Sequence, residues 1–513
     1  MAKTLAPRSM GRVRRTDVQV QIAHDRSRAR FVFATITALT LFMAGVAYVR
    51  APEPFPIALL VLLLACVAAF LRPTVGVFVL VFLTMIGDSA TMPWWPFVKN
   101  MSSRESILFV DDKLILNPLE LVAAVTTVSW LLRALVDRSW TFVRGRMLAP
   151  ICIFTAFVLY GFIRGISTGG DKRIAVFEGR PLFYMAITYI LVTNLLTTRR
   201  QYVRLVMTAM VAVSIQSIFS LQYYRGLPAA ERESLESLSG HSATIAMNAL
   251  FVLFFGAVLF RCSRWLRWVS FALCIPVAWA YLLSQRRAAM VALFVGVFIL
   301  LAVTFQRRRR AFWFVAPTTV LLGIGVVAAT WNAVGMFGLP AQAVKTVFFP
   351  DQLSDADTSS DLYRQIENWN LYYTIRVNRV FGVGFGQKFL RPVAMPDISF
   401  FEFWEYIPHN NVLWVWIKMG FLGFASLLFL FGRAVQLGAR SITLIRSNDH
   451  VAFAVVGLAY VVMFLVFAYV DIAWDARCTV FLGVSMALSA DFVQARDVDA
   501  ERRPAQHFEM VPQ

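Results

Sequence analysis

Long runs of hydrophobic residues alternate with short polar connections along most of the chain. The runs are long enough to cross a hydrocarbon layer ~30 Å thick as helices, and they lack the period-two alternation of barrel strands. They predict spans at 31–49, 55–71, 74–91, 117–136, 147–164, 182–198, 201–221, 242–260, 266–283, 287–305, 311–330, 407–432, 451–470 and 477–492. The pattern therefore predicts an all-α polytopic membrane protein with about 12–14 transmembrane helices.

The charged residues in the connections predict how the chain is oriented. Arginines gather in every second connection, where acidic residues are scarce. These arginines are Arg72; Arg133, Arg138, Arg144 and Arg146; Arg199, Arg200 and Arg204; Arg261, Arg264 and Arg267; Arg307 to Arg310; and Arg433, Arg440 and Arg446. Cytoplasmic connections carry such an excess. The pattern places both termini in the cytoplasm and the alternate connections on the outer side.

The longest polar connection, residues 331–406, falls on the predicted outer side. Hydrophobic residues recur in it every three or four positions, at Leu362, Ile366, Trp369, Tyr373 and Val377. Arg364, Glu367 and Asn368 fall on other faces of the same segment. This spacing predicts an amphipathic helix, and we expect the helix to lie over the mouth of the transmembrane bundle as a lid.

The composition supports the membrane assignment. Hydrophobic residues make up 58% of the 513 residues, and the mean hydropathy is +0.64. The formal net charge is +19 at pH 7, but the arginines lie in the connections, so we expect contact with membrane lipids and no binding of nucleic acid. The five cysteines have no CxxC spacing, which predicts neither a disulfide framework nor a zinc site.

The two ends of the chain are predicted to be tails. Residues 1–30 carry several arginines ahead of the first hydrophobic run, 31–49. That run is longer than the core of a signal peptide and lacks a convincing small-residue cleavage site, so we interpret it as a retained span after a basic cytoplasmic tail. Residues 31–179 are then the N-terminal transmembrane helices, and residues 491–513 are a second cytoplasmic tail.

A histidine at the border between the long connection and the next span is the first candidate for chemistry. His409 follows Pro408 in the sequence PHNNVLWVWIKMG. Histidine exchanges protons near neutral pH, so His409 is a candidate general base. A lone histidine is also found as a hydrogen-bonded residue at a helix start, and on chemistry alone this simpler interpretation is favoured.

Four arginines lie on the predicted outer side, against the usual charge bias: Arg180, Arg286, Arg287 and Arg364. Guanidinium groups bind phosphate oxygens through two parallel hydrogen bonds and stay charged at physiological pH. Such a cluster would suit a lipid-linked pyrophosphate. For each arginine alone, a salt bridge or a snorkelling side chain explains its position about equally well.

Two acidic patterns suggest weaker hypotheses. Asp355 and Asp357 form a DAD triplet like the one that holds a divalent metal in many sugar-nucleotide transferases, but the polar sequence around them favours a turn. Asp471 and Asp475 lie in the last outer connection beside Arg477. We expect them to pair with that arginine, and orientation of His409 is the alternative.

The glycines of GVGFG, at 382–386, do not form a nucleotide-binding loop. The run does not match GxGxxG and follows no buried strand. We expect its glycines to permit a tight re-entry of the chain toward the membrane.

The region around His409 resembles the bacterial O-antigen ligase and polymerase family. His409-Asn410, nine residues and then Gly420 are similar to the H-N-x9-G signature of that family. RVNRVFGVGFGQ resembles the glycine-rich entry to the same region, and Arg364, in SSDLYRQIENW, matches the arginine that opens the loop helix.

A second segment, SQRRAAM, resembles the serine-arginine segment at an outer helix end in this family. Arg287 is the closer equivalent and Arg286 is the alternative. The family has a leucine four residues after the arginine, whereas this chain has Val291 after Arg287 and Met290 after Arg286. The choice between the two arginines stays open at this point.

The resemblance implies a glycosyltransferase of GT-C-like architecture over residues 180–490, in the bacterial inner membrane, working without metal or cofactor. The implied donor is a glycan on polyprenyl pyrophosphate, and the implied acceptor is a hydroxyl of a glycan or lipid-linked glycan. His409 would be the catalytic base. The implied substrate-binding residues are Arg180, Arg286, Arg287, Arg364 and Asn410.

Two choices stay open within this interpretation. The long connection and the extra spans slightly favour an O-antigen or exopolysaccharide polymerase over a ligase. A flippase or transporter of lipid-linked glycans, without transferase activity, is the alternative from another class. The concentration of polar features on one side of the membrane speaks against transport.

Overall fold

The computed structural model describes residues 54–137, 142–233, 235, 237–333, 335–353, 355–398 and 401–497. The regular elements in these ranges are helices. The α-helices are α2 (Phe55–Leu71), α3 (Pro73–Ile86), α4 (Pro118–Val136), α5 (Leu148–Ser167), α6 (Lys172–Leu195), α7 (Arg199–Gly226), α8 (Ala229–Glu233), α9 (His241–Leu259), α10 (Arg264–Leu283), α11 (Arg287–Arg307), α12 (Arg309–Ala329), α13 (Leu339–Phe348), α14 (Asp355–Val377), α15 (Asn411–Leu444), α16 (Asn448–Val470) and α17 (Ala476–Ala490). Two short 3-10 helices, η1 (Gly335–Gly338) and η2 (Pro350–Gln352), flank α13.

Ten helices in the described ranges are long and apolar enough to cross a membrane, and α2, α3 and α17 are shorter apolar helices. Each span that the sequence predicted within these ranges corresponds to one of these helices. The prediction of an all-α polytopic membrane protein is therefore confirmed. The predicted tail at 1–30, the predicted span at 31–49 and residues 498–513 lie outside the described residues.

The start of α6 differs from the predicted span. The helix begins at Lys172 rather than at 182, because the Asp171 side chain accepts hydrogen bonds from the first backbone N–H groups and caps it. Its first turns contain charged residues, which lower the local hydropathy and concealed the true start. Arg180 therefore lies inside a helix instead of entering one from outside.

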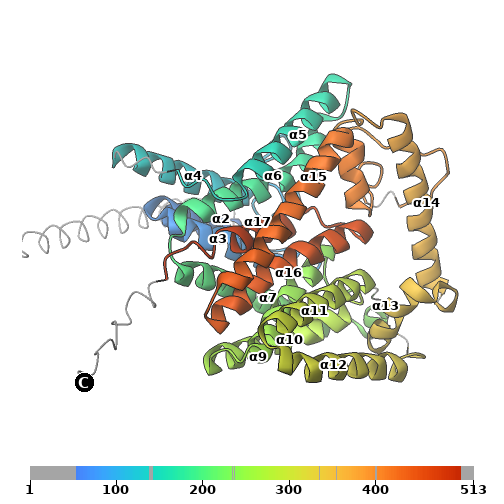
Figure 1. Ribbon diagram of the computed structural model, residues 1–513. Coiled ribbons are helices and arrows are strands. Elements are labelled where there is room, and N and C mark those ends of the chain that lie inside the picture. The colour runs from blue at the N-terminus through green and yellow to red at the C-terminus, as the bar shows by residue number, and fades with distance from the viewer. Residues whose placement is uncertain are drawn as a thin grey trace, which may run out of the picture.

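The helices form a bundle with α16 at its centre. α16 contacts α9, α11, α15 and α17, and α17 also packs against α6. Figure 1 shows α14 at the edge of the bundle, where it runs at a steep angle to α15 and α16, from the region of α13 toward the ends of α5 and α15. The predicted helix in the long connection is confirmed, and it lies across the helix ends as a lid would.

The buried face of α14 is not the predicted hydrophobic stripe. Trp369 is 72% exposed and Leu362 is 53% exposed. The buried side chains instead include Glu367, Leu371 and Thr374, and Leu371 packs in a small core with the start of α15. α14 thus turns a partly polar face toward the bundle, which is where a site needs polar groups.

Arginines of the predicted cytoplasmic connections that the structure describes lie at helix ends away from α14. Arg133 donates to the carbonyl of Leu71 at 2.6 Å, between the ends of α4 and α2. Arg308 donates to the carbonyl of Leu259 at 2.8 Å, between α12 and the end of α9. Arginines beside helix C-termini also satisfy free carbonyls there. The bundle therefore has one basic end and one end covered by α14.

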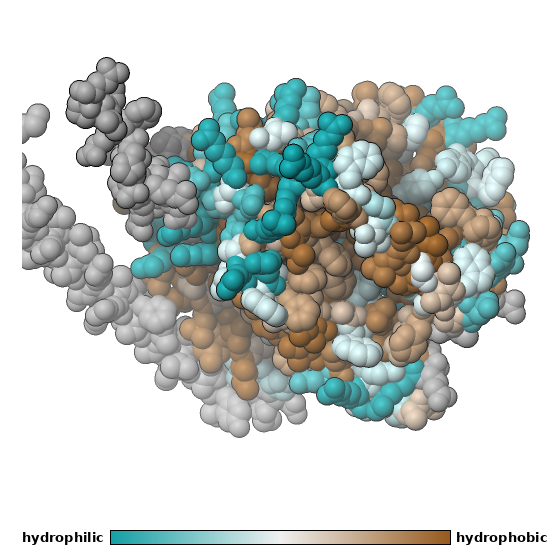
Figure 2. Space-filling model, turned by 60° about the horizontal axis from the view of Figure 1, so that its bottom comes forward, coloured by the Kyte–Doolittle hydropathy of each residue, from teal (hydrophilic) through white to brown (hydrophobic). Residues whose placement is uncertain are grey.

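The outer surface of the bundle is largely hydrophobic. In Figure 2 hydrophobic residues cover much of the middle of the face shown, and hydrophilic residues gather near its upper left and its edges. α12 has no buried residue, and its Phe314 and Leu321 are 77% and 68% exposed. Such a surface is stable in lipid, where apolar side chains face hydrocarbon instead of water.

The GVGFG run inserts between α5 and α15. Gly382, Gly384 and Gly386 have φ values of 69°, 91° and 77°, which glycine adopts without steric cost. The backbone N–H of Phe385 donates to the carbonyl of Gly161 on α5 at 3.0 Å. A Cβ at Gly165 would lie 1.8 Å from the carbonyl oxygen of Phe385. The predicted re-entry of the chain is confirmed.

The glycine of the H-N-x9-G signature has a structural role. α15 is broken at Gly420, where φ is 70° and ψ is −174°. A Cβ there would lie 2.1 Å from the carbonyl oxygen of Val380, which precedes the glycine run. Glycine is needed both for the conformation and for the close approach. The kink fixes how the first half of α15, which begins beside His409, meets the re-entrant chain.

A buried ion pair anchors the same segment. Lys418 on α15 lies 2.7 Å from Glu178 on α6, and both side chains are fully buried. Lys418 also donates to the carbonyl of Gln387, and the backbone N–H of Gly386 donates to Glu178, both at 2.5 Å. A buried ion pair is tolerated only when its remaining hydrogen-bonding groups are satisfied. The glycine run supplies those partners.

Candidate active site

His409 lies between α14 and the start of α15, where one buried carboxylate holds it. Its Nδ1 is 3.2 Å from Glu367 Oε1 and 3.3 Å from Oε2, and its backbone N–H donates to Oε2 at 2.9 Å. The Glu367 side chain is 2% exposed, whereas His409 is 22% exposed. The ring of Tyr363 meets the imidazole edge-on, with centroids 5.7 Å apart. The imidazole is thus oriented from α14 and keeps access to solvent.

This contact determines the tautomer of His409. An ionised carboxylate can only accept, so Nδ1 carries the proton and donates to Glu367. In the neutral ring, Nε2 then has a lone pair on the opposite edge. A neutral imidazole with an accessible Nε2, oriented by a buried carboxylate, has the arrangement of a general base.

The two asparagines after His409 position the helix start. Asn410 caps α15 by accepting from the backbone N–H of Leu413 at 3.0 Å, and it donates to Asn368 Oδ1 on α14 at 3.1 Å. Asn411 is fully buried, and its Oδ1 accepts from the backbone N–H of Ala473 at 2.8 Å. The signature therefore joins three segments: α14, α15 and the connection between α16 and α17.

A polar cavity of about 740 Å³ opens beside His409. Its walls come from the loop before α14, α14 itself, the start of α15 and the end of α16. Its polar lining includes Asp361, Arg364, Gln365, Glu367, Asn368, His409, Asn410 and Tyr469. The cavity is large enough for a sugar with a phosphate group.

Two of the predicted arginines meet at one wall of this cavity. Arg287, the first residue of α11, binds Asp361 through two hydrogen bonds, from NH2 to Oδ1 at 3.0 Å and from NH1 to Oδ2 at 3.2 Å. Arg364 NH1 lies 3.4 Å from the same Oδ1. Arg287 is 10% exposed and Arg364 is 26% exposed. Asp361 thus bridges Arg287 to the cavity, and Arg364 is the more accessible of the two.

Arg286 takes a different direction from Arg287. It is the N-cap residue of α11, after Gln285, whose φ of 48° turns the chain sharply between α10 and α11. Its positive charge acts on Asp471, after α16. Both arginines therefore lie at the end of the bundle that α14 covers, on two sides of one tight turn.

The comparison with known proteins concerns this same region. Residues 272–428 match a family model described as O-antigen ligase. This segment is therefore similar to the O-antigen ligase family. An O-antigen ligase of Salmonella typhimurium is 28% identical over 132 residues, which are 24% of this chain and 33% of that protein. The chain thus matches about a third of the length of the curated relative.

The matched segment contains most of the predicted site. Arg286, Arg287, Arg364, His409 and Asn410 all fall within the matched residues. Arg364, His409 and Asn410 line the cavity, Arg287 binds Asp361 at its wall, and Arg286 lies beside Arg287 on the turn.

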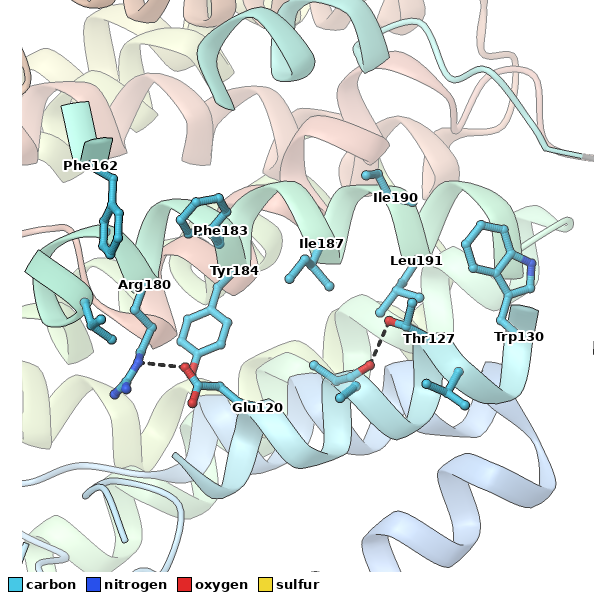
Figure 3. Close-up of a pocket in the computed structure, with 15 residues that line it drawn as sticks. Glu120, Thr127, Trp130, Phe162, Arg180, Phe183, Tyr184, Ile187, Ile190 and Leu191 are labelled. Carbon is cyan, nitrogen blue, oxygen red and sulfur yellow. Dashed lines mark hydrogen bonds and ion pairs between the residues drawn. The ribbon is translucent and has the colours of Figure 1, made fainter. Parts of the chain in front are cut away.

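Arg180 is not brought to this site. It lies on α6, where its Nε is 2.7 Å from Glu120 Oε1 on α4, and it also donates to the Asn100 side chain and to the carbonyl of Ile115. Figure 3 shows Arg180 and Glu120 at one end of a separate, mainly hydrophobic pocket between α4 and α6. Its guanidinium contacts protein groups through every side-chain nitrogen, so the simpler expectation of a salt bridge describes it.

The carboxylates of the site were not identified from the sequence. Glu367 was placed only off the hydrophobic stripe, and Asp361 was not singled out. A signal was present, because Asp361, Arg364 and Glu367 are three residues apart and therefore share one side of α14. The side chains of Asp355 and Asp357, the DAD triplet, are not described.

The expected pairing of Asp471 with Arg477 is wrong. Asp471 Oδ1 lies 2.5 Å from Nδ1 of His241, and Arg477 lies 3.5 Å from Asp88. The alternative, orientation of His409 by Asp471, is not found either, since Glu367 has that position. The segment from 471 to 475 folds back on Asn411, so Asp471 and Arg477 point to different neighbours.

Proposed function

We propose that this protein is a membrane glycosyltransferase that transfers a glycan from polyprenyl pyrophosphate to a sugar hydroxyl. The observation that carries the proposal is the His409–Glu367 pair at a polar cavity that also contains Arg364. The match of the same segment to the O-antigen ligase family supports it. The cavity then holds the reacting groups of donor and acceptor, while their lipids stay in the membrane.

In the proposed reaction His409 acts as the base. Its Nε2 takes the proton from the acceptor hydroxyl as the oxygen attacks the anomeric carbon of the donor. A bond forms between that oxygen and the anomeric carbon, and the bond from the carbon to the phosphate oxygen breaks. The electron pair leaves with the pyrophosphate. Glu367 stabilises the imidazolium that forms, and a single displacement inverts the anomeric centre.

The arginines neutralise the leaving group. Arg364 has one long contact with Asp361 and lines the cavity, so it is placed to contact the pyrophosphate. Arg287 is bound to Asp361 through two hydrogen bonds and serves chiefly to position that carboxylate and, through it, Arg364. Cationic donors at a departing phosphate stabilise the charge that develops in the transition state. Arg180 has no part in this proposal.

The proposed setting is the bacterial inner membrane. The end of the bundle covered by α14 would face outward, and the arginine-rich end would face the cytoplasm, in line with the bias of cytoplasmic connections toward arginine. Both termini would then be cytoplasmic. Independence of a metal ion stays a prediction, and transfer that persists in excess chelator would support it.

The acceptor distinguishes a ligase from a polymerase. The long connection favoured a polymerase, whereas the matched relative is an O-antigen ligase. We therefore propose a ligase that transfers the glycan to the lipid A core. In a strain that lacks this protein, a ligase defect leaves full-length glycan chains on the polyprenyl carrier and none on the core.

Other outcomes of that experiment would contradict the ligase. Single repeats on the carrier would indicate a polymerase. Lipid-linked glycan that remains on the cytoplasmic side would indicate a flippase. Complementation with the wild-type gene must restore the original pattern in each case.

A further inference from the structure

A second histidine–carboxylate pair lies near the proposed active site. His241, the first residue of α9, has its Nδ1 2.5 Å from Oδ1 of Asp471. The Asp471 side chain is 1% exposed and that of His241 is 35% exposed. As at His409, a buried carboxylate holds one edge of an accessible imidazole. The proposed reaction uses only one base, so the second pair needs another role.

The segment before His241 is hydrogen-bonded to the turn that carries Arg286 and Arg287. The segment before it is joined to that turn by a hydrogen bond between the hydroxyls of Ser239 and Ser284, 2.6 Å apart. The hydroxyl of Ser237 also donates to the carbonyl of Ser284 at 2.8 Å. Ser284 is followed two residues later by Arg286. The start of α9 and the start of α11 are thus held together.

Asp471 connects this pair to the cavity. Tyr469 and Val470, directly before it, line the cavity with Arg364. Burial acts to raise the pKa of Asp471, but His241, Arg286 and Arg364 together lower it below its usual range. Asp471 is therefore ionised and surrounded by cationic groups. Its Oδ2 is buried and has no hydrogen-bond partner among the described residues.

The remaining charges near His241 are already compensated. The backbone N–H of Gly240 donates to Asp88 Oδ2 at 3.2 Å, and Asp88 forms an ion pair with Arg477. Asp475 caps α17 by accepting from the backbone N–H of Cys478 at 2.8 Å. Asp471 is therefore the carboxylate that holds the ring, and Arg286 and Arg364 are the cations that share its charge.

We infer that His241 is an anion-binding residue for the pyrophosphate of the donor, held by Asp471 and acting with Arg286 and Arg364. This inference rests on the proposed function. With Nδ1 donating to Asp471, protonation of Nε2 gives a second donor on the accessible edge of the ring. A positively charged donor on that edge suits a phosphate oxygen. His409 keeps the role of base.

Binding of undecaprenyl pyrophosphate without a sugar tests this inference. Purified full-length protein in nanodiscs would be titrated by calorimetry. The wild type is expected to bind the probe. His241→Gln is expected to bind about tenfold more weakly or worse. His241→Arg is expected to bind within about threefold of the wild type, because it keeps a positive charge and hydrogen-bond donors at this position.

His450 provides a matched control at the other end of the molecule. It lies near the start of α16 beside Asp497 and away from the cavity. His450→Gln should bind the probe like the wild type. The control shows whether loss of any histidine weakens binding.

Several results would overturn the inference. Equal binding by the wild type and His241→Gln would remove His241 from the anion site. Weak binding by both His241 variants, together with a lowered unfolding temperature, would assign His241 a structural role. If the wild type itself does not bind the probe, the proposed donor is wrong, which is a separate failure.

Discussion

Glu367 holds both the backbone N–H and the Nδ1 of His409, so a single buried carboxylate determines the orientation of the ring and its tautomer. Glu367→Gln would place an amide against Nδ1 and weaken both the orientation and the stabilisation of the imidazolium. We expect kcat for glycan transfer to fall ~10²–10⁴-fold with little change in KM. Glu402, which is exposed, provides the control Glu402→Gln, expected to be neutral. A KM effect alone would contradict this role of Glu367.

Arg364 reaches the cavity and makes only one long contact with Asp361. Arg364→Lys keeps the charge and loses the planar pair of donors that matches a phosphate. The expected loss in kcat/KM is roughly 10²-fold. Arg376, exposed on the same helix, gives the control Arg376→Lys. Wild-type kinetics for Arg364→Lys would argue against a contact with pyrophosphate.

At the scale of residues, the sequence pointed to side chains whose chemistry follows from the residue type alone. His409 and Arg364 were identified because proton exchange and fixed charge follow from residue type, and because motif spacing singled them out. Their partners were not identified, because Glu367 differs from an ordinary exposed glutamate only in being buried against His409. Arg180 was misplaced for the related reason that its partner, Glu120, lies on another helix.

At the scale of elements, the kink in α15 joins the signature to the re-entrant chain. Gly420→Ala would place a Cβ 2.1 Å from the carbonyl oxygen of Val380, in a left-handed conformation that alanine disfavours. We expect it to lower the free energy of unfolding by at least ~2 kcal/mol and to reduce transfer. Denaturant titration of the purified protein measures the first effect.

The same helix provides the control for this substitution. Gly432 has nothing within 4 Å of where its Cβ would be. Gly432→Ala should be neutral or slightly stabilising, by up to about 1 kcal/mol, because alanine has the higher helix propensity. If the two variants unfold alike, the kink is not a structural requirement.

The sequence predicted the spans well and their ends less well. Hydropathy locates a helix interior because apolar side chains there face lipid or other helices. It fails where a helix extends beyond the hydrocarbon, as in the first turns of α6. The re-entry at 382–386 was predictable because three alternate glycines have few other uses. The face that α14 turns toward the bundle was not predictable, because its hydrophobic stripe is exposed and its buried face is partly polar.

At the scale of the molecule, the two ends of the bundle must lie on opposite sides of the membrane. Single cysteines at Asp397, in the connection after α14, and at Arg440, near the end of α15, would be placed in a variant without the native cysteines. Both positions are exposed. A membrane-impermeant maleimide should label position 397 in cells with a permeabilised outer membrane. Position 440 should react only after the inner membrane is opened.

Labelling of both positions, or of position 440 alone, in intact inner membranes would contradict this topology. The arginines in the connections predict the overall orientation, because each basic connection is expected on the cytoplasmic side. The contacts among α9, α11 and α16 were not predictable, since similar apolar surfaces can pair in many ways. For that reason the His241–Asp471 pair became visible only in the structure.

In the proposed reaction, His409 removes the acceptor proton during transfer of a lipid-linked glycan. The most direct measurement is single-turnover transfer from a polyprenyl-pyrophosphate-linked glycan to its acceptor by purified protein, with wild type and His409→Gln compared at equal donor occupancy. The variant is expected to bind the donor normally and to transfer at least ~10²-fold more slowly. Undiminished transfer by His409→Gln would contradict it.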